Sequence, residues 1–388
     1  MIERILGEKL RHLASQYSVV TLTGPRQSGK STLVRSLFPE LPYLPLEDPD
    51  VRLLAQADPR GFLANYADGA IFDEVQQVPE LFSYLQGVVD AGHHRQPYIL
   101  TGSQNFLLMD KISQTLAGRT AVLRLLPLSL PELQAAGKVP DSVEELLFQG
   151  GYPRLINRRL DPADFFPAYI QTYLERDVRS LKNIVDLSAF SRFLRLCAGR
   201  AGNLLNLSAL ANDCGIAVNT AKAWLSVLEA SYVVFLLEPY HKSFNKRIIK
   251  SPKLFFYDTG LVCSLLGLRR ADLVETYYMR GALFENWVVS EVAKHFTNRG
   301  QRPPIYFWQD KTGREVDLLV ETNGKLIPIE IKAGQTMRPD YFDQLAYWNE
   351  LSGNSSQNSF VVYGGSKRLS TKLGTYTPIA DIGSILEG

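Results

Sequence analysis

Residues 18–37 read Ser-Val-Val-Thr-Leu-Thr-Gly-Pro-Arg-Gln-Ser-Gly-Lys-Ser-Thr-Leu-Val-Arg-Ser-Leu. In this stretch an apolar run is followed by a turn rich in glycine and proline, and then by a helical pattern. The turn fits G-x-x-x-x-G-K-[ST], the pattern of a phosphate-binding loop, with Gly24 at its start and Gly29-Lys30-Ser31 at its end. The strand before it and the helix after it favour this interpretation over a glycine-rich turn that matches by chance.

The residue types in the loop suit an anionic ligand. Gly24 and Gly29 allow backbone angles that turn successive N–H groups toward one point, and the following helix adds the positive end of its dipole. We expect Lys30 to reach the β- and γ-phosphates of ATP and the Ser31 hydroxyl to bind Mg²⁺. The predicted nucleotide-binding residues are Gly24, Pro25, Arg26, Gln27, Ser28, Gly29, Lys30, Ser31 and Thr32.

The length and composition indicate an ordinary globular protein of several domains. A chain of 388 residues with a net charge of +2 points to two or three domains and carries no global signal for a nucleic-acid partner. Cys197, Cys214 and Cys263 lie far apart, without the spacing of a zinc site or a disulfide framework. We find neither a signal peptide nor an apolar run long enough to span a membrane, so we predict a cytoplasmic protein.

Two carboxylates follow a short apolar strand at residues 69–74, Gly-Ala-Ile-Phe-Asp-Glu. In an open parallel sheet, ligands collect beyond the carboxyl ends of the strands. Asp73 is then placed to hold the Mg²⁺ shell, and Glu74 to orient or deprotonate a water that attacks the γ-phosphate. The alternation of strands and helices across residues 1–150 predicts an α/β domain with a mostly parallel sheet.

Two further regions of this domain carry candidates for catalysis. Ser103 ends the apolar strand 97–103, where it or Gln104 could contact the γ-phosphate or the attacking water, and an ordinary turn is the alternative. A helical pattern over 105–117 leads to Arg119, which could reach a nucleotide across a subunit interface as an arginine finger. Arg119 is equally well placed to cap the carbonyls of its own helix.

Residues 151–275 are predicted to form a helical region that includes a winged helix-turn-helix. A short helix over 207–211, a glycine turn, a second helix over 219–230 and a strand over 233–237 follow one another in the expected order. Such a module reads DNA in some proteins and only packs in others, and its second helix carries little positive charge here. A basic hairpin would supply phosphate contacts, unless it is a solvated surface: Lys242, Lys246, Arg247, Lys250 and Lys253.

Residues 276–388 contain a charged face on a predicted sheet. In the strand 326–332, alternation with period two places Glu330 and Lys332 together on one face. A short hairpin before this strand brings Asp317 alongside. Carboxylates and a lysine that meet in this way can bind a cation and act on a phosphodiester.

A further carboxylate comes from a predicted helix. Glu285 has only small or apolar neighbours three and four residues away, where a carboxylate is costly without a partner. Together Glu285, Asp317 and Glu330 can hold Mg²⁺, and Lys332 can steer a water, which is the Asp…Glu-x-Lys pattern of restriction-endonuclease-like nucleases. Cleavage itself is left open because a fold does not guarantee its chemistry, and a solvated sheet face is the alternative.

Over nearly its whole length the chain resembles the bacterial and archaeal AAA-type ATPases that carry a C-terminal domain of nuclease-like fold. The resemblance rests on ordered segments: Gly-Pro-Arg-Gln-Ser-Gly-Lys-Ser (24–31), Ile-Phe-Asp-Glu-Val-Gln (71–76), Leu-Thr-Gly-Ser (100–103), Leu-Ala-Gly-Arg-Thr (116–120), Pro-Leu-Ser (127–129), Gly-Gly-Tyr-Pro-Arg (150–154), Tyr-Leu-Glu-Arg-Asp-Val (173–178), Phe-Tyr-Asp-Thr-Gly-Leu (256–261), Gly-Ala-Leu-Phe-Glu-Asn (281–286), Glu-Val-Asp (315–317) and Glu-Ile-Lys (330–332). It implies an AAA-type P-loop ATPase domain over 1–150, a helical lid and winged helix over 151–275, and a PD-(D/E)xK nuclease-like domain over 276–388.

The resemblance also implies roles for residues already named: nucleotide and metal binding by Lys30 and Ser31, hydrolysis by Asp73 and Glu74, and polar sensing by Ser103. Arg119 is similar in position to the arginine finger of the wider class. The Gly-Gly-Tyr-Pro segment is similar to the turn that opens the helical lid of related ATPases, but no second sensor arginine is evident.

Three functional hypotheses follow from these patterns. In the first, Mg²⁺-dependent ATP hydrolysis drives or gates a C-terminal module that acts on DNA or a partner protein. In the second, the chain is a nucleotide-gated, Mg²⁺-dependent nuclease. In the third, ATP is a bound switch, and the winged helix of a non-catalytic sensor grips DNA or protein. An acting arginine finger would favour a homo-oligomer, whereas a monomer would suit the switch.

Overall fold

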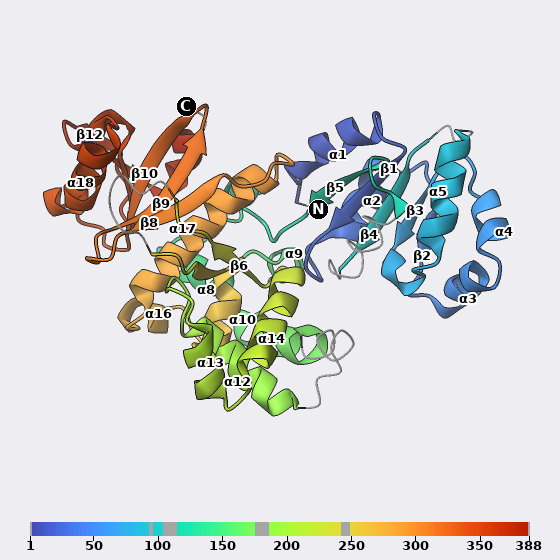
Figure 1. The fold of residues 1–388 in the computed structure, drawn as a ribbon, viewed down its shortest axis with the longest axis horizontal. Coiled ribbons are helices and arrows are strands. Elements are labelled where there is room, and N and C mark those ends of the chain that lie inside the picture. Colours follow the sequence, from blue (N-terminus) through green and yellow to red (C-terminus); the bar gives the residue numbers. More distant parts are fainter. Residues whose placement is uncertain (1, 93–95, 104–114, 175–185, 242–248, 387–388) are drawn as a thin grey trace.

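The computed structural model describes residues 2–92, 96–103, 115–174, 186–241 and 249–386. Most of the expected helix over 105–117 and Gln104 lie outside these ranges, as do Lys242, Lys246 and Arg247 of the expected basic hairpin. Figure 1 shows the N-terminal sheet domain at one end of the molecule, the C-terminal sheet at the other, and the helical middle region beside the latter.

The N-terminal domain is built on a five-stranded sheet with the order β2-β3-β4-β1-β5. Every neighbouring pair of strands is parallel, which confirms the predicted α/β domain. The strands are β1 (Val19–Thr23), β2 (Tyr43–Pro45), β3 (Ala70–Asp73), β4 (Tyr98–Gly102) and β5 (Thr120–Arg124). The helices are α1 (Leu6–Ala14), α2 (Lys30–Leu37), α3 (Pro49–Ala57), α4 (Pro59–Ala64) and α5 (Leu81–Ala91).

Helices cover both faces of this sheet, which explains why its strands are apolar without alternation. Val20 and Ile99 pack with α1 and α2 on one face, and Phe72 and Leu100 pack with α5 on the other. All five residues of β1 are buried. A strand whose two faces are both covered exposes no side chains to water, so its residues are apolar without alternation. The phosphate loop follows the carboxyl end of β1 and therefore lies at that edge of the sheet.

The middle region is mainly helical, with one antiparallel pair of strands, β6 (Val234–Leu237) and β7 (Lys253–Phe256). Gly215, with φ of 70°, ends α13 and permits the turn into α14, where Trp224 and Leu228 are buried. The helices are α7 (Leu130–Ala135), α8 (Val143–Gln149), α9 (Pro153–Arg158), α10 (Pro162–Tyr169) with the π-helix Ile170–Leu174, α12 (Leu187–Ala198), α13 (Leu207–Cys214), α14 (Val218–Ala230), α15 (Thr259–Leu265) and α16 (Asp272–Thr276).

The C-terminal region begins with the long helix α17 (Arg280–Thr297) and continues into a six-stranded sheet of order β12-β13-β11-β10-β9-β8. The predicted hairpin is present, since Thr322 pairs with Lys325 between antiparallel β9 and β10. The other elements are β8 (Ile305–Gln309), β9 (Glu315–Thr322), β10 (Lys325–Lys332), α18 (Asp343–Ser352), β11 (Phe360–Tyr363), β12 (Leu369–Thr371), β13 (Gly374–Pro378) and α19 (Gly383–Leu386).

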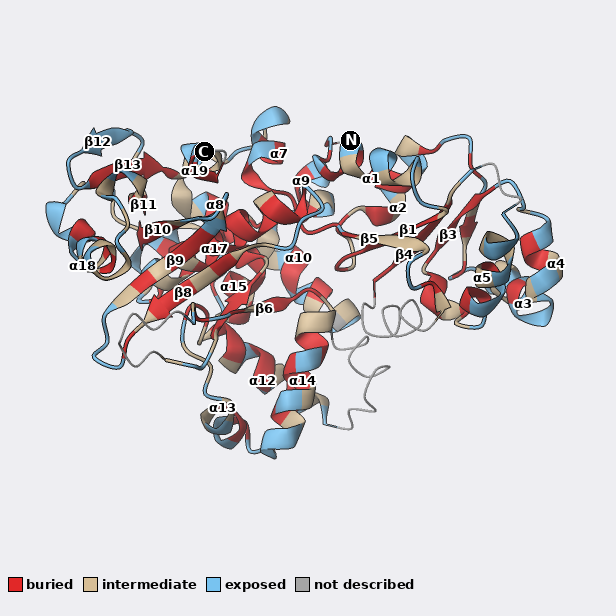
Figure 2. Ribbon diagram, turned by 45° about the horizontal axis from the view of Figure 1, so that its top comes forward, coloured by how far each residue is buried: buried red, intermediate tan, exposed pale blue. Residues whose placement is uncertain are grey.

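One hydrophobic core joins the middle and C-terminal regions. It includes Phe193 of α12, Phe255 of β7, Val288 of α17 and Ile329 of β10, all fully buried. Figure 2 shows α17 buried along most of its length at the centre of this assembly. The two regions therefore share their packing, and the boundary near residue 275 remains a prediction from sequence. No helix in the described ranges is long and apolar enough to cross a lipid bilayer.

Candidate functional site

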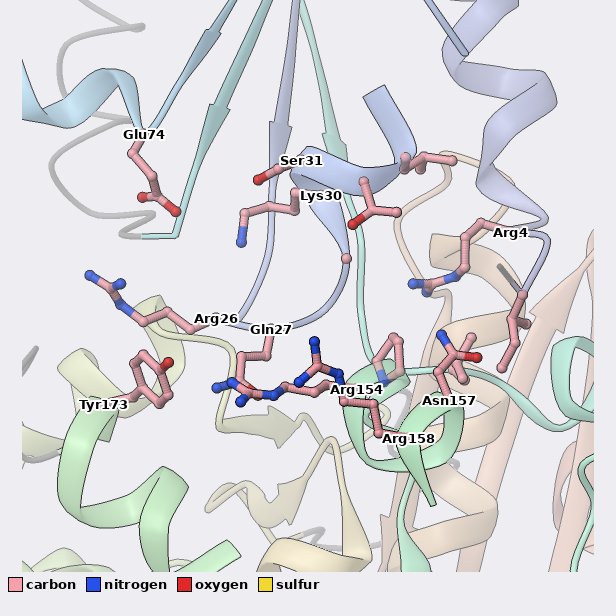
Figure 3. A pocket seen from close by; sticks show the side chains of 16 residues that line it. Arg4, Arg26, Gln27, Lys30, Ser31, Glu74, Arg154, Asn157, Arg158 and Tyr173 are labelled. Carbon is pink, nitrogen blue, oxygen red and sulfur yellow. The ribbon is translucent and has the colours of Figure 1, made fainter. Parts of the chain in front are cut away.

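A cavity of about 400 Å³ lies at the carboxyl ends of the parallel strands, beside the phosphate loop (Figure 3). The loop comes from the β1–α2 connection, and α9 and the π-helix close the cavity from the opposite side (Figure 3). The lining residues are Ile2, Arg4, Arg26, Gln27, Gly29, Lys30, Ser31, Thr32, Leu33, Glu74, Leu128, Pro153, Arg154, Asn157, Arg158 and Tyr173. Most of the predicted nucleotide-binding residues therefore meet one cavity.

The phosphate loop has the backbone conformation that its glycines were expected to permit. Gly24 has φ of 150° and Gly29 has φ of 95°. A Cβ atom at Gly24 would lie 2.2 Å from the Leu125 carbonyl oxygen, so no other residue fits there without moving the chain directly after β5. Gln27 also has a positive φ, of 62°, and its Oε1 is buried without a partner among the described residues. The strained backbone and the unpartnered oxygen of Gln27 are both typical of a loop that binds a ligand.

Lys30 is folded back onto its own loop. Its ammonium donates to the carbonyl oxygens of Gly24 and Pro25, each at 2.9 Å, and the residue is 5% exposed. A phosphate arriving in the cavity would offer this ammonium charged oxygens in place of neutral carbonyls, and a charge-assisted bond is the stronger of the two.

Asp73 lies at the end of β3 and is buried. Its carboxylate accepts hydrogen bonds from the hydroxyls of Thr101 and Tyr43. The Ser31 side chain lies close to the same Tyr43 hydroxyl, so Tyr43 neighbours both predicted Mg²⁺ ligands. Burial, with the Asp73 charge, raises the pKa of Tyr43 above its usual value, so this hydroxyl stays protonated. Nothing in the sequence pattern had pointed to Tyr43.

Glu74 faces the loop across the cavity (Figure 3). Its carboxylate accepts from the Ser103 hydroxyl at 2.9 Å and from the Ser103 amide at 3.2 Å, and it also contacts Gln76. Burial is the largest effect and raises the pKa of Glu74, but the Lys30 charge opposes it. The Gln76 and Ser103 hydrogen bonds and the Arg26 charge act in the same direction as Lys30, so the pKa of Glu74 lies below its usual value. The carboxylate is therefore ionised, as a proton acceptor must be.

Arg4 is a supporting residue that sequence analysis did not single out. Its guanidinium donates to Glu132 Oε1 at 3.0 Å, to the Ser28 carbonyl at 2.7 Å and to the Leu126 carbonyl at 2.6 Å. Arg4 and Glu132 are both almost fully buried. The ion pair thus ties the phosphate loop to the chain that follows β5.

Two arginines of α9 line the cavity, although no second sensor arginine was evident in the lid from the sequence. Arg154 and Arg158 are exposed, lie one helical turn apart, and line the cavity together with Asn157. Among the described residues neither arginine forms an ion pair. The signal in the sequence was an i, i+4 arginine pair immediately after Gly-Gly-Tyr-Pro. With Arg4, Arg26 and Lys30, these arginines give the cavity a strong excess of positive charge over Glu74.

Arg119 is not among the described residues that line the cavity. It forms a two-pronged ion pair with Asp90 of α5, at 2.5 and 3.0 Å, and donates to the Ala117 carbonyl at 3.3 Å. Within one chain Arg119 therefore makes its contacts inside the N-terminal domain, with α5 and with the carbonyl of Ala117. The arginine-finger role across a subunit interface stays a prediction.

The expected C-terminal carboxylates meet on one side of the C-terminal sheet. Glu285, Asp317 and also Glu315 offer oxygens that lie within 4.8 Å of one another. Asp317 accepts a hydrogen bond from the Ile331 amide at 2.8 Å. Glu330 and Lys332 form an ion pair of 2.6 Å. Glu315 was quoted in the motif but not predicted as a site residue.

Lys253 corrects the expectation of a solvent-facing basic hairpin. It is 4% exposed, and its ammonium lies 3.0 Å from Glu285 Oε1 and contacts Glu315. It is the partner that Glu285 needed. Burial and then the charge of Asp317 raise the pKa of Glu285 to about 7, and the same two causes raise that of Glu330 to about 8. As arranged here, the cluster holds the Lys253 ammonium between Glu285 and Glu315, so we derive no cleavage step from it.

Comparison with protein families divides the chain into three parts. Residues 16–134 match the AAA domain, residues 140–272 a domain of unknown function (DUF8612), and residues 280–382 a domain of unknown function (DUF4143). The first part is therefore an AAA-type P-loop ATPase domain, as expected. These matches name neither a winged helix nor a nuclease, so both remain interpretations.

Two curated relatives align with most of the chain. They are the uncharacterized proteins Rv2008c of Mycobacterium tuberculosis and Mb2031c of Mycobacterium bovis, each 30% identical over 336 residues, which is 86% of this chain and 74% of the relative. Among solved structures, the Walker-type ATPase PABY2304 of Pyrococcus abyssi has a TM-score of 0.48 at 17% identity, covering 68% of this chain and 96% of that one. AMPPCP-bound DnaA from Aquifex aeolicus has a TM-score of 0.30 at 15% identity, covering 58% and 86%. Both scores lie below 0.5, so the assignment of the first domain depends on the AAA match.

Proposed function

Because the chain belongs to the family of the two mycobacterial proteins and carries an AAA domain, we propose that it hydrolyses ATP with Mg²⁺ and that nucleotide state drives or gates its C-terminal region. One observation carries the proposal: Lys30, Ser31 and an ionised Glu74 line the same cavity, in which positive charge prevails. A triphosphate is the ligand class that this charge pattern favours.

The donors present fit a nucleotide-bound Mg²⁺. Ser31 and Asp73 lie on either side of Tyr43, and the Asp73 carboxylate has no cationic partner among the described residues. Hydroxyl and carboxylate oxygens are the ligands that Mg²⁺ prefers. When bound, the ion would neutralise charge that develops on the phosphates.

The side chains of the cavity then have separable roles. Lys30 would exchange its carbonyl partners for phosphate oxygens, and Glu74 would accept the proton of an attacking water while Ser103 holds the carboxylate in place. Arg154 and Arg158 would contact the phosphates from the opposite wall. Because they belong to the middle region, their contact would make its position depend on the nucleotide.

The contacts of α17 support transmission to the C-terminal region. Glu291 accepts from the Leu130 amide at 2.7 Å, and the Lys294 ammonium donates to the Leu128 carbonyl at 3.2 Å. Leu128 also lines the nucleotide cavity. A shift at the cavity wall therefore has a direct route into the helix that bears Glu285.

The test is ATP turnover with Mg²⁺, with and without single- and double-stranded DNA. We expect Lys30→Ala to lose nucleotide binding, and Glu74→Gln to keep binding but lose turnover. Glu80→Gln is the matched control because Glu80 is exposed and outside the cavity. Unchanged turnover in Lys30→Ala would refute the proposal. Stimulation by DNA would favour a DNA partner for the C-terminal region, and indifference to DNA would favour a protein.

The carboxylate cluster keeps nuclease activity as a second candidate. It predicts Mg²⁺-dependent cleavage that disappears in Asp317→Ala and in Lys332→Ala while the fold is retained. Cleavage that survives both changes would exclude this site. The non-catalytic switch is distinguished from both enzymes by tight ATP binding without turnover.

A further inference from the structure

The carboxylate cluster is assembled from three elements. Glu285 comes from α17, whereas Glu315 and Asp317 alternate along β9 and so share a face. On β10, Glu330 follows Ile329, which pairs with Leu318, and this brings Glu330 beside Asp317. Four carboxylates thus gather at one place, with buried Glu330 only 5% exposed.

A cation already lies inside this cluster, and it belongs to a different part of the chain. Lys253 opens β7 of the middle region, and its side chain is 5% exposed. Its ammonium is 3.0 Å from Glu285 Oε1, touches Glu315, and lies 5.5 Å from the centre of the Phe307 ring. Glu285 and Glu315 are two of the three residues whose oxygens are close enough to share a metal ion.

The ammonium does not satisfy the whole cluster. Glu330 Oε1 accepts from Lys332 at 2.6 Å, but Glu330 Oε2 is buried without a hydrogen-bond partner among the described residues. Two lysines contact a group of four carboxylates, so acceptor oxygens remain in excess of the ammonium donors. The unpartnered Glu330 Oε2 is a buried acceptor that a divalent cation, with more ligand positions than an ammonium has donors, would use.

We propose that Lys253 takes the place of a divalent cation in this cluster, so that the lysine at the start of β7 closes the C-terminal site to metal. A single lysine from the middle region thereby acts as a built-in competitor of the metal ion. The ammonium and a divalent ion cannot both occupy the space between Glu285 and Glu315, because like charges at that separation repel. Removing the ammonium should convert the cluster into a metal site.

The test uses the full chain without nucleotide and Mn²⁺ as the probe, with binding measured from the loss of the free-ion EPR signal. We expect Lys253→Met to bind one Mn²⁺ per chain more than the wild type does, at an affinity at least about tenfold higher than any wild-type binding at this place. Lys250→Met is the matched control, since Lys250 is exposed and precedes β7 in the same segment. Adding Asp317→Asn to Lys253→Met should abolish the extra site.

Thermal unfolding gives a second readout that does not require activity. Mn²⁺ should raise the melting temperature of Lys253→Met and leave the wild type and Lys250→Met unchanged. If Lys253→Met fails to fold, Lys253→Met with Glu285→Gln lowers the charge left unpaired and retains Glu315, Asp317 and Glu330. A folded variant that gains no Mn²⁺ site, or a wild type that binds Mn²⁺ at the cluster as tightly as the variant, would overturn the proposal. None of these outcomes depends on ATP hydrolysis.

Discussion

Replacing Arg4 by methionine should test whether a buried ion pair holds the phosphate loop. Methionine preserves much of the length of the side chain but removes all donors. The Ser28 and Leu126 carbonyls would each lose a hydrogen bond, of 2.7 and 2.6 Å, and Glu132 would lose its cation at 3.0 Å. The perturbation is therefore confined to one polar network next to the nucleotide cavity.

The expected cost follows from the burial of both partners, since Arg4 is 7% and Glu132 1% exposed. Breaking a buried pair by removing one partner costs about 3–5 kcal/mol because a charge is left uncompensated. Glu132 keeps hydrogen bonds from the Ile5 and Ser129 amides, so we expect a value near the lower end. ATP affinity should also fall roughly tenfold, or about 1.4 kcal/mol, because the Ser28 carbonyl is no longer held.

The assay is urea unfolding of the full chain, following the transition that ATP shifts, together with ATP titration. A double-mutant cycle with Glu132→Gln separates the pair from its surroundings, and we expect a coupling energy of about 2–3 kcal/mol. Arg11→Met is the control, because exposed Arg11 on α1 should change stability by less than about 0.5 kcal/mol. A cost below about 1 kcal/mol for Arg4→Met, or fully additive effects in the cycle, would refute the reasoning.

Four further outcomes are expected. Glu74→Gln should lower kcat by about 10²–10⁴-fold with ATP affinity retained, in steady-state turnover and nucleotide titration; an equal loss in Glu80→Gln would contradict the assigned role. Arg154→Ala and Arg158→Ala should each weaken ATP binding by about 1–2 kcal/mol, measured by titration, whereas no loss in the double variant would remove α9 from the site. Tyr43→Phe should raise the Mg²⁺ concentration needed for half-maximal turnover, since Tyr43 links Asp73 and Ser31, and an unchanged requirement would count against that link. Burial, with the Arg299 charge, lowers the pKa of His295 from 6.5 to about 4. Between these pH values the folded state therefore binds fewer protons than the unfolded state, and the free energy of unfolding falls as the pH drops from 6.5 toward 4. His295→Gln should flatten that part of the stability profile, and a profile as steep as that of the wild type would show that other groups cause it.

The phosphate loop and the parallel sheet could be predicted from the sequence because both are local. The loop needs its glycines, Lys30 and Ser31 in one contiguous segment, and each strand shows its burial as an apolar run. The same reasoning anticipated the Thr322–Lys325 hairpin and the meeting of Asp317 with Glu330. In these cases the neighbours in space are neighbours in sequence or in register.

Other features depended on how distant segments dock. Arg4 reaches Glu132, and Arg154 and Arg158 reach the cavity, only because the chain after β5 and the lid helix fold back against the loop. Lys253 looked like a surface lysine among others in a basic run. Only the tertiary structure shows it to be buried between Glu285 and Glu315.

The sequence by itself determined an α/β nucleotide-binding domain, because backbone angles and residue types in a short segment specify a phosphate loop. Only the tertiary structure decided which charges face one another. The energy of a charged side chain depends on its burial and on partners that can come from any part of the chain, and neither is written in the residues beside it. For that reason the positions of Lys253 and Arg154 became visible only once the helices and sheets were in place.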